Sequence, residues 1–275
     1  MRRMKIILNS IKGIVLTMLL FLYVVPFIFV LVNSFKTRGE VIINPVKLPA
    51  SFNFKNYINA YDKMDYMHAF TNSLIVTLFS VLLIVIFASM TAYILVRKNW
   101  KFTKYMFFIF VASMIIPFQG IMIPLVKIYG SIGMLNSKWA LIYMYVGFGT
   151  ALAVFMYHGF IKSIPVELEE AAMIDGCTQL QTFWEIVFPL LKPTTMTIVI
   201  LDVLWIWNDF LLPSLVLIKA NERTLPLSTY YFYGTYTVDY GLSMAGLMLT
   251  VIPVIIVYLF MQKHIINGVL QGSIK

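Results

Sequence analysis

The sequence predicts an all-α membrane protein with six transmembrane helices. Of its 275 residues, 60% are hydrophobic and only 12% are charged, and the mean hydropathy is +0.86. Soluble domains are about 45–50% apolar and could not hide this much apolar surface from water. The apolar residues also fall into runs of roughly 20, the length that a helix needs to cross about 30 Å of hydrocarbon.

The first predicted span covers residues 12–32 and follows a basic N-terminal segment. A secretory signal peptide begins in the same way. This run, however, is long enough to cross a membrane, and residues 33–36 do not form a small-residue cleavage site. We therefore expect a first helix that is retained.

Five further apolar runs predict the remaining spans. An even number of spans places both termini on one side, and the basic residues in the short loops of that side indicate that it is cytoplasmic. Since no internal repeat or soluble domain is visible, residues 1–275 are predicted to form a single transmembrane domain. The five spans are residues 73–96, 105–125, 139–161, 194–218 and 242–261.

Polar residues interrupt the fifth of these spans. Charged groups at membrane depth usually face a cavity or a partner, so Asp202 and Asn208 are predicted to line a translocation pathway. Asp209 lies nearer the end of the span and is expected to reach the membrane interface. Asp202 and Asp209 lie about two helical turns apart, which also fits a proton relay or an intramembrane aspartyl protease, although no Gly-x-Gly-Asp motif accompanies them.

The composition argues against several other classes of protein. The net charge of +9 is explained by basic loops beside apolar spans, so we expect the lipid bilayer, and no nucleic acid, as a partner. Cys177 is the single cysteine, which rules out an intrachain disulfide. The sequence contains no G-x-x-x-x-G-K-[ST] phosphate loop and no His or Cys metal motif. We therefore predict no enzyme activity, no metal site and no cofactor bound by this chain.

A tyrosine-rich segment, Lys219–Gly241, is predicted to lie outside the cell. Such aromatic residues are typical of a membrane-interface belt. They are equally typical of a contact surface for an external protein, in which case Tyr230, Tyr231 and Tyr233 are the candidate contacts.

The cytoplasmic loop of residues 162–193 differs from the other loops because it carries five acidic residues. Ser163 is a candidate N-cap for a first short helix, and Gly176 is a candidate stop. Thr178 and Gln181 form a capping-box pattern that predicts a second helix. Helices that lie on lipid surfaces prefer basic residues, so this acidic loop is better suited to docking against another protein.

The residues of this loop resemble the EAA motif of ABC-importer permeases. The match runs from Glu170-Ala171-Ala172 through Asp175-Gly176 to Phe183 and Pro189. Further similarity to MalG-like subunits of carbohydrate-uptake importers extends over nearly the whole chain, in residues 72–74, 92–97, 207–211 and the C-terminal tail.

The resemblance implies a type I ABC-importer permease fold and a permease subunit that carries a sugar or oligosaccharide into a bacterial cell. The expected partners are a second homologous permease subunit in a heterodimer, two cytoplasmic ATPases that bind ATP-Mg, and an extracytoplasmic sugar-binding protein. The resemblance further implies that Glu170 pairs with a basic residue of the ATPase, that Ala171 and Ala172 pack against it, and that Gly176 sets the turn. The expected location is the bacterial inner membrane, crossed several times.

Three alternatives remain open from the sequence. The substrate could be glycerol phosphate or another polyol, since specificity in such systems depends largely on other subunits. A gradient-driven secondary transporter or channel would need no ATPase. A membrane scaffold or an intramembrane enzyme would bind or react without moving a solute. The acidic two-helix loop favours the importer, because the rival classes have no need of it.

Overall fold

The computed structural model describes residues 2–98, 100–232 and 239–273. Helices are the only regular secondary structure in this part of the chain, which confirms the all-α prediction. The chain divides into two compact units, residues 1–66 with 228–253 and residues 67–227 with 254–275.

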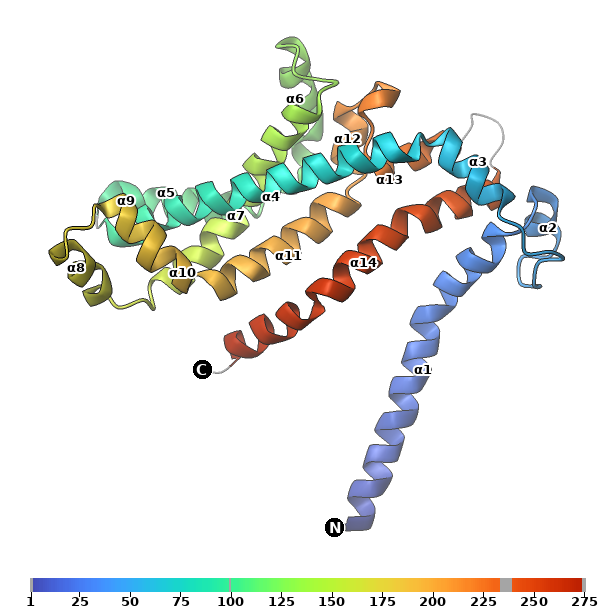
Figure 1. Ribbon diagram of the computed structural model, residues 1–275, viewed down its shortest axis with the longest axis horizontal. Helices are drawn as coiled ribbons and strands as arrows, with labels where there is room; N and C mark the ends of the chain where they lie inside the picture. Colours follow the sequence, from blue (N-terminus) through green and yellow to red (C-terminus); the bar gives the residue numbers. More distant parts are fainter. Residues whose placement is uncertain (1, 99, 233–238, 274–275) are drawn as a thin grey trace. The chain divides into compact units, whose positions relative to one another are not determined.

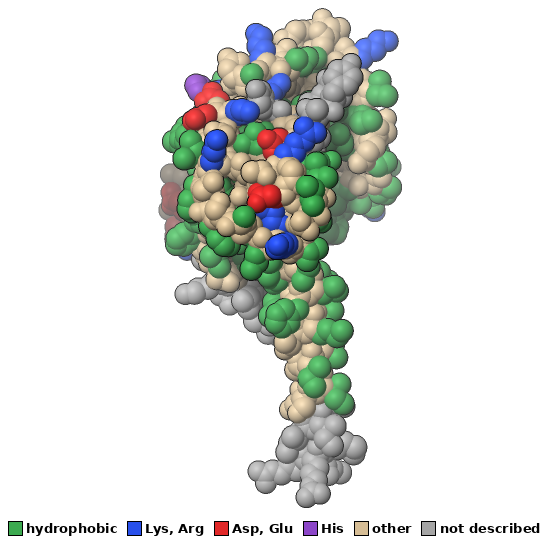
Figure 2. All heavy atoms as spheres, turned by 90° about the vertical axis from the view of Figure 1, so that its right-hand side faces the viewer, with side chains coloured by type: hydrophobic (Ala, Val, Ile, Leu, Met, Phe, Trp, Pro, Cys, Tyr) green, Lys and Arg blue, Asp and Glu red, His purple; other side chains and the backbone are tan. Residues whose placement is uncertain are grey.

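The first unit contains one long apolar helix and a folded segment after it. Hydrophobic side chains are exposed along α1, and Figure 2 shows them on the visible face of this helix, whereas charged side chains gather over α2 and α3. Such an apolar surface is suited to lipid. The elements of this unit are α1 (Arg2–Ser34), α2 (Arg38–Ile43), α3 (Lys55–Lys63), the 3₁₀ turn η3 (Thr229–Phe232) and the first part of α14 (Tyr240–Ser273).

A buried lysine organises the segment that follows α1. Lys36 is only 2% exposed, and its Nζ donates hydrogen bonds to Asn33 Oδ1 at 2.9 Å and to the carbonyls of Asn44 and Pro45 at 3.0 Å each. Its own carbonyl accepts from Asn56 Nδ2 at 2.8 Å. Because a buried ammonium must find hydrogen-bond acceptors, these contacts fix the path of the chain around Lys36.

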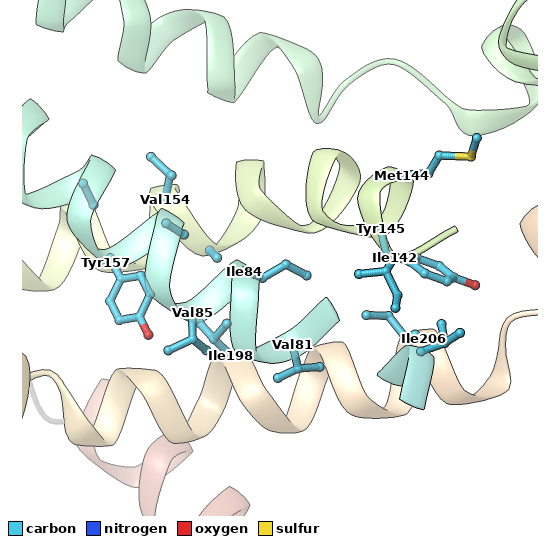
Figure 3. Close-up of a cluster of buried hydrophobic side chains, with 14 of the residues drawn as sticks. Val81, Ile84, Val85, Ile142, Met144, Tyr145, Val154, Tyr157, Ile198 and Ile206 are labelled. Carbon is cyan, nitrogen blue, oxygen red and sulfur yellow. The ribbon is translucent and has the colours of Figure 1, made fainter. Parts of the chain in front are cut away.

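The second unit is built around three helices. α4 (Tyr66–Arg97), α7 (Lys138–Ile161) and α11 (Lys192–Asn208) supply the buried hydrophobic side chains shown in Figure 3. The remaining elements are α5 (Lys101–Ser113), α6 (Phe118–Ser131), α8 (Glu167–Ile174), α9 (Gln179–Gln181), η1 (Thr182–Val187), α10 (Phe188–Leu190), α12 (Leu211–Val216), η2 (Ala220–Glu222) and α13 (Leu225–Ser228).

Small residues let these core helices approach closely. A Cβ added at Gly149 of α7 would lie 2.5 Å from Ile84 Cδ1 of α4, and Ala88 of α4 is fully buried. In Figure 3, Tyr157 points from α7 towards α11, where its hydroxyl donates to Thr195 Oγ1 at 2.9 Å. Packing of small residues together with interhelical hydrogen bonds is typical of helices in a membrane.

The described residues contain four helices that are long and apolar enough to cross a membrane, and up to six spans if each of two bent helix pairs counts as one. This agrees with the expected six-helix membrane fold. The single helices are Asn9–Ser34 of α1, Tyr66–Arg97, Lys138–Ile161 and Tyr240–Phe260 of α14.

One bent pair lies where a single third span, residues 105–125, was expected. α5 ends at Ser113 and α6 begins at Phe118, and the two helices meet at 102°. Pro117 is the N-cap of α6. Proline has no N–H to donate and disfavours helical backbone at the residue before it, so the helix ends here and restarts in a new direction.

The second bent pair is Gln179–Leu190 with Lys192–Asn208, which meet at 75°. The fifth expected span, residues 194–218, is itself divided between α11 and α12. α11 ends at Asn208, and Asp209 takes an extended backbone with ψ of 131°. The Asp209 carboxylate then accepts the Leu211 amide at 2.9 Å, at the start of α12. Asp209 is the C-cap of α11, and Phe210 is the N-cap of α12, so these two residues separate the helices. α12 packs beside α6 in the same unit.

Candidate functional site

The acidic loop between α7 and α11 forms two short helical pieces at one end of α4 (Figure 1). The first, α8, begins later than predicted. Its N-cap is Val166, without a side-chain hydrogen bond, while the Ser163 hydroxyl donates to the carbonyl of Phe160 at 2.7 Å. The predicted N-cap at Ser163 is therefore wrong, because this serine closes the end of α7 instead.

Neighbouring glutamates of α8 face opposite environments. Glu169 is 2% exposed. Its Oε2 accepts from the Tyr93 hydroxyl at 2.8 Å, and its Oε1 accepts from Arg97 Nε at 2.7 Å. Arg97 Nη2 lies 2.7 Å from the same Oε1 and also donates to the carbonyl of Ile164 at 3.0 Å. Both carboxylate oxygens of Glu169 are thus bound by residues of α4.

Glu170, the next residue, is exposed. Ala171 is exposed beside it, whereas Ala172 is buried against the loop. Ile174 at the end of the helix is 85% exposed. The outer face of α8 therefore offers a carboxylate, a small residue and a protruding apolar side chain next to one another.

A glycine turn joins α8 to the second helical piece. Gly176 has φ of +91°, a backbone conformation that residues with a Cβ rarely adopt, and Asp175 is the C-cap before it. The capping box predicted at Thr178 is confirmed: its hydroxyl accepts the Gln181 amide, and the Gln181 side chain accepts the Thr178 amide at 2.8 Å. The turn is held by local interactions.

The second piece is α9, η1 and α10, in which η1 is a π-helix, a form frequent at functional sites. Phe183 is buried there, and its ring centroid lies 5.2 Å from that of Tyr93. Pro189 is exposed within α10. A groove of about 490 Å³ lies between this piece and the end of α4, lined by Met90, Tyr93, Lys98, Trp100, Leu180 and Phe183 among others.

The predicted pathway residues lie in different surroundings. Asp202 is 4% exposed, and its Oδ2 has no hydrogen-bond partner among the described residues. Asn208 is exposed and donates to the carbonyl of Leu204 in its own helix at 2.7 Å. Asp209 accepts from the Tyr145 hydroxyl at 2.9 Å, in addition to accepting the Leu211 amide, so its carboxylate is held inside the unit.

The tyrosine-rich segment is only partly described. Tyr230 is 56% exposed, whereas the side chain of Tyr231 and all of Tyr233 lie outside the described residues. The chain just before it is anchored by Asn72, whose Nδ2 donates to the carbonyls of Asn221 at 2.9 Å and Arg223 at 3.1 Å.

Sequence reasoning missed the contact of Glu169 with Tyr93 and Arg97. The only signal for it was the spacing of Tyr93 and Arg97, four residues apart and hence on one face of a helix, next to an acidic loop that needs a cation. Ile174 was also missed, since the motif specifies no residue at this position. In the part of the chain that is described, no three His, Cys, Asp or Glu residues come together as a metal site.

Comparison with known proteins places this arrangement in a family. The family model described as binding-protein-dependent transport system inner membrane component matches residues 80–271. The chain is 46% identical to the probable starch degradation products transport system permease protein AmyC of Thermoanaerobacterium thermosulfurigenes, over 96% of this chain and 94% of that protein. It is 37% identical to the multiple sugar-binding transport system permease protein MsmG of Streptococcus mutans, over 96% of both chains.

The fold has a solved counterpart. A chain in the crystal structure of a bacterial ABC transporter involved in the import of the acidic polysaccharide alginate matches with a TM-score of 0.81 and 23% identity, over 94% of this chain and 96% of that chain. This confirms the expected ABC-importer permease fold, and the relatives confirm the resemblance to carbohydrate-uptake permeases. They are transport permeases and not enzymes. The chain therefore belongs to the inner membrane components of binding-protein-dependent transport systems.

Proposed function

We propose that this chain is a permease subunit of an ATP-driven importer that moves a sugar or oligosaccharide through the inner membrane, and that a separate ATPase docks on the outer face of α8. The observation that carries the proposal is that the two neighbouring glutamates have different surroundings, one buried and one exposed. Both carboxylate oxygens of Glu169 accept hydrogen bonds within the protein. Glu170, in contrast, is exposed and accessible to a partner.

The chemistry of α8 supports a protein partner. Glu170 can form a charge-assisted hydrogen bond with an arginine or lysine, Ala171 allows close approach, and Ile174 offers an apolar anchor of the kind that fills a pocket. The Gly176 turn and the Thr178 capping box fix this face before the partner arrives. A preformed surface loses less entropy on binding.

The proposed substrate class follows from the relatives. Their names refer to starch degradation products, multiple sugars, and melibiose, raffinose and stachyose, which supports an oligosaccharide over glycerol phosphate or another polyol. Uptake of radiolabelled maltodextrin, raffinose and glycerol phosphate by cells with the complete transporter distinguishes these classes. Uptake of glycerol phosphate alone would contradict the sugar assignment.

The proposed assembly contains a second homologous permease subunit, two ATPases that bind ATP-Mg, and an external sugar-binding protein. In this arrangement the α8 loop and both termini are cytoplasmic, and Tyr230 is a candidate contact for the binding protein. Asn208 is exposed on α11 and could meet the substrate or the second subunit, whereas Asp202 would have to be uncovered by a movement of the helices.

Tyr230→Ser should raise the binding-protein concentration needed for half-maximal uptake. An unchanged concentration would show that Tyr230 is not part of the contact.

The docking proposal is tested by reversing the exposed charge. Glu170→Lys should abolish sugar uptake and co-purification of the ATPase, because two basic groups would then face each other. The protein should still insert into the membrane, since the Glu170 side chain makes no hydrogen bond with any described residue. Gly176→Pro should have the same effect, because proline cannot adopt a φ of +91°.

Glu185→Lys is the matched control. Glu185 is also an exposed glutamate of the loop, but it lies in η1 and not on α8. Uptake and ATPase binding should remain close to those of the unaltered protein. If Glu170→Lys retains the ATPase as Glu185→Lys does, α8 is not the docking element.

A further inference from the structure

We propose that Tyr93 and Arg97 are positioning residues that join α8 to α4 as one moving body, so that a displacement of α8 enters the membrane domain through α4. This inference rests on the proposed docking of an ATPase at α8. It adds the mechanical route by which that docking reaches the transmembrane helices.

The geometry around Glu169 fixes α8 on α4. Three side chains form the Glu169 latch, defined as Tyr93, Arg97 and Glu169. One carboxylate oxygen accepts from the Tyr93 hydroxyl, and the other accepts from the guanidinium of Arg97. Two donors from one helix therefore hold one carboxylate in a fixed position and orientation, which a single contact could not do.

Arg97 also fixes the link that precedes α8. Its Nη2 donates to the carbonyl of Ile164, in the stretch between α7 and α8. Movement of α8 relative to α4 would break the bonds to Glu169, and movement of the link with it would also break the bond to Ile164. The route from α8 to the membrane helices through α7 is therefore tied to α4 as well.

Tyr93 contacts both helical pieces of the loop. Its hydroxyl binds Glu169 of α8, while its ring packs on Phe183 of η1 at a centroid distance of 5.2 Å. Farther along α4, Ile84 and Val85 belong to the buried core with α7 and α11. A close-packed core transmits a rigid displacement with little loss, so α4 connects the loop to the whole unit.

The contact between Arg97 and Glu169 is better explained by the orientation that it fixes than by the stability that it adds. A buried salt bridge is often no more stabilising than a pair of apolar residues of similar volume, because both ions lose their hydration. Charge-assisted hydrogen bonds to both carboxylate oxygens do, however, fix orientation. The double variant Arg97→Met with Glu169→Leu removes this directional bonding without leaving an unpaired buried charge, so it separates coupling from folding.

The experiment uses the complete transporter in proteoliposomes with its ATPases and binding protein. Spin labels at Leu82→Cys of α4 and Glu167→Cys of α8, both exposed positions, report the distance between the two helices in a Cys177→Ser background. With the latch intact, the distance should be the same in the nucleotide-free and ATP-trapped states. With Arg97→Met and Glu169→Leu, the distances in the two states should differ or broaden.

Transport and hydrolysis provide the functional readout. The double variant should keep its bound ATPase and its ATP hydrolysis, while sugar uptake per ATP falls about tenfold, within the range of known coupling effects. Arg97→Lys keeps the charge but cannot bind Glu169 and Ile164 with a guanidinium fork, so it should give intermediate uptake.

The outcomes separate this inference from the docking proposal. If the ATPase co-purifies but the labelled distance changes between states with the latch intact, the one-body inference is overturned and docking stands. Full uptake by the double variant overturns it as well. If no ATPase co-purifies with the unaltered chain, the docking proposal fails, and the inference that depends on it fails too.

Discussion

The α2–α3 segment of the first unit and the α8–α9 segment of the second solve similar local problems in different ways. Each contains a threonine capping box, Thr37 with Glu40 and Thr178 with Gln181. Each also buries one charged side chain, Lys36 in the first and Glu169 in the second. The first buried charge is satisfied by neutral oxygens at most nine residues away, the second by an arginine 72 residues away.

The difference shows what each buried charge can accomplish. Contacts within nine residues fix the fold of their own segment and nothing else. The ion pair between Glu169 and Arg97 instead fastens a loop to a core helix that is distant in sequence, so an event at the loop acts on that helix. A buried charge therefore stabilises only its own segment at Lys36, whereas at Glu169 it connects a loop to a core helix.

The largest expected effect comes from removing one member of the long-range pair. Arg97→Ala leaves the Glu169 carboxylate buried without its cation, a change that typically costs about 3–5 kcal/mol. The free energy of unfolding in detergent micelles, measured by denaturant titration, should fall by about that amount. Arg97→Met with Glu169→Leu should recover most of the loss. Equal stability of Arg97→Ala and the unaltered protein would show that the buried Glu169 carboxylate does not depend on Arg97.

A smaller and more local effect is expected at Lys36. Lys36→Met keeps an apolar stem but leaves the Asn33 side chain and two backbone carbonyls without their donor, which costs about 1–3 kcal/mol. Hydrogen exchange should accelerate in residues 37–50 and remain unchanged in α8. Faster exchange in α8, or none in residues 37–50, would show that the lysine does not act as a local brace.

The smallest effect distinguishes the two capping boxes by pH. Hydrogen bonds from the Thr37 amide and hydroxyl hold the pKa of Glu40 below its usual value of 4.5. A carboxyl with a lowered folded-state pKa contributes its stabilisation above its unfolded-state pKa and loses it as the pH falls through the folded-state value. Protection of α2 amides, corrected for intrinsic exchange rates, should therefore weaken below about pH 4.5.

Gln181 makes the equivalent contacts with an amide, which does not titrate in this range, so protection of α9 should stay constant. Glu40→Gln is the control, because it should make α2 as insensitive to pH as α9. A similar loss of protection in α9 would attribute the effect to general acid unfolding rather than to the Glu40 cap.

Local features of the candidate site could be predicted from the sequence, and distant contacts could not. The Gly176 turn and the Thr178 capping box depend on residues within a few positions, so their signals survive without a structure. Glu169 is buried and Glu170 is exposed because Arg97, which belongs to another helix, binds Glu169. Ser163 failed as an N-cap because a serine at a helix end can close the preceding helix equally well.

The same limit applies to the spans. Apolar runs of about 20 residues identified the membrane helices because that signal is compositional. A proline such as Pro117 favours a break in a helix, but the 102° bend depends on how α5 packs on α7 and α6 on α12. Periodicity in one sequence carries no information about those partners.

The single cysteine of the chain has a practical consequence. Cys177 directly follows Gly176, is partly exposed, and its amide donates to the carbonyl of Ala172 at 3.0 Å. A maleimide dye would therefore attach at one place only, in the turn after α8, without any engineered substitution. Its fluorescence and its rate of alkylation would give a footprint of whatever covers this turn during a transport cycle.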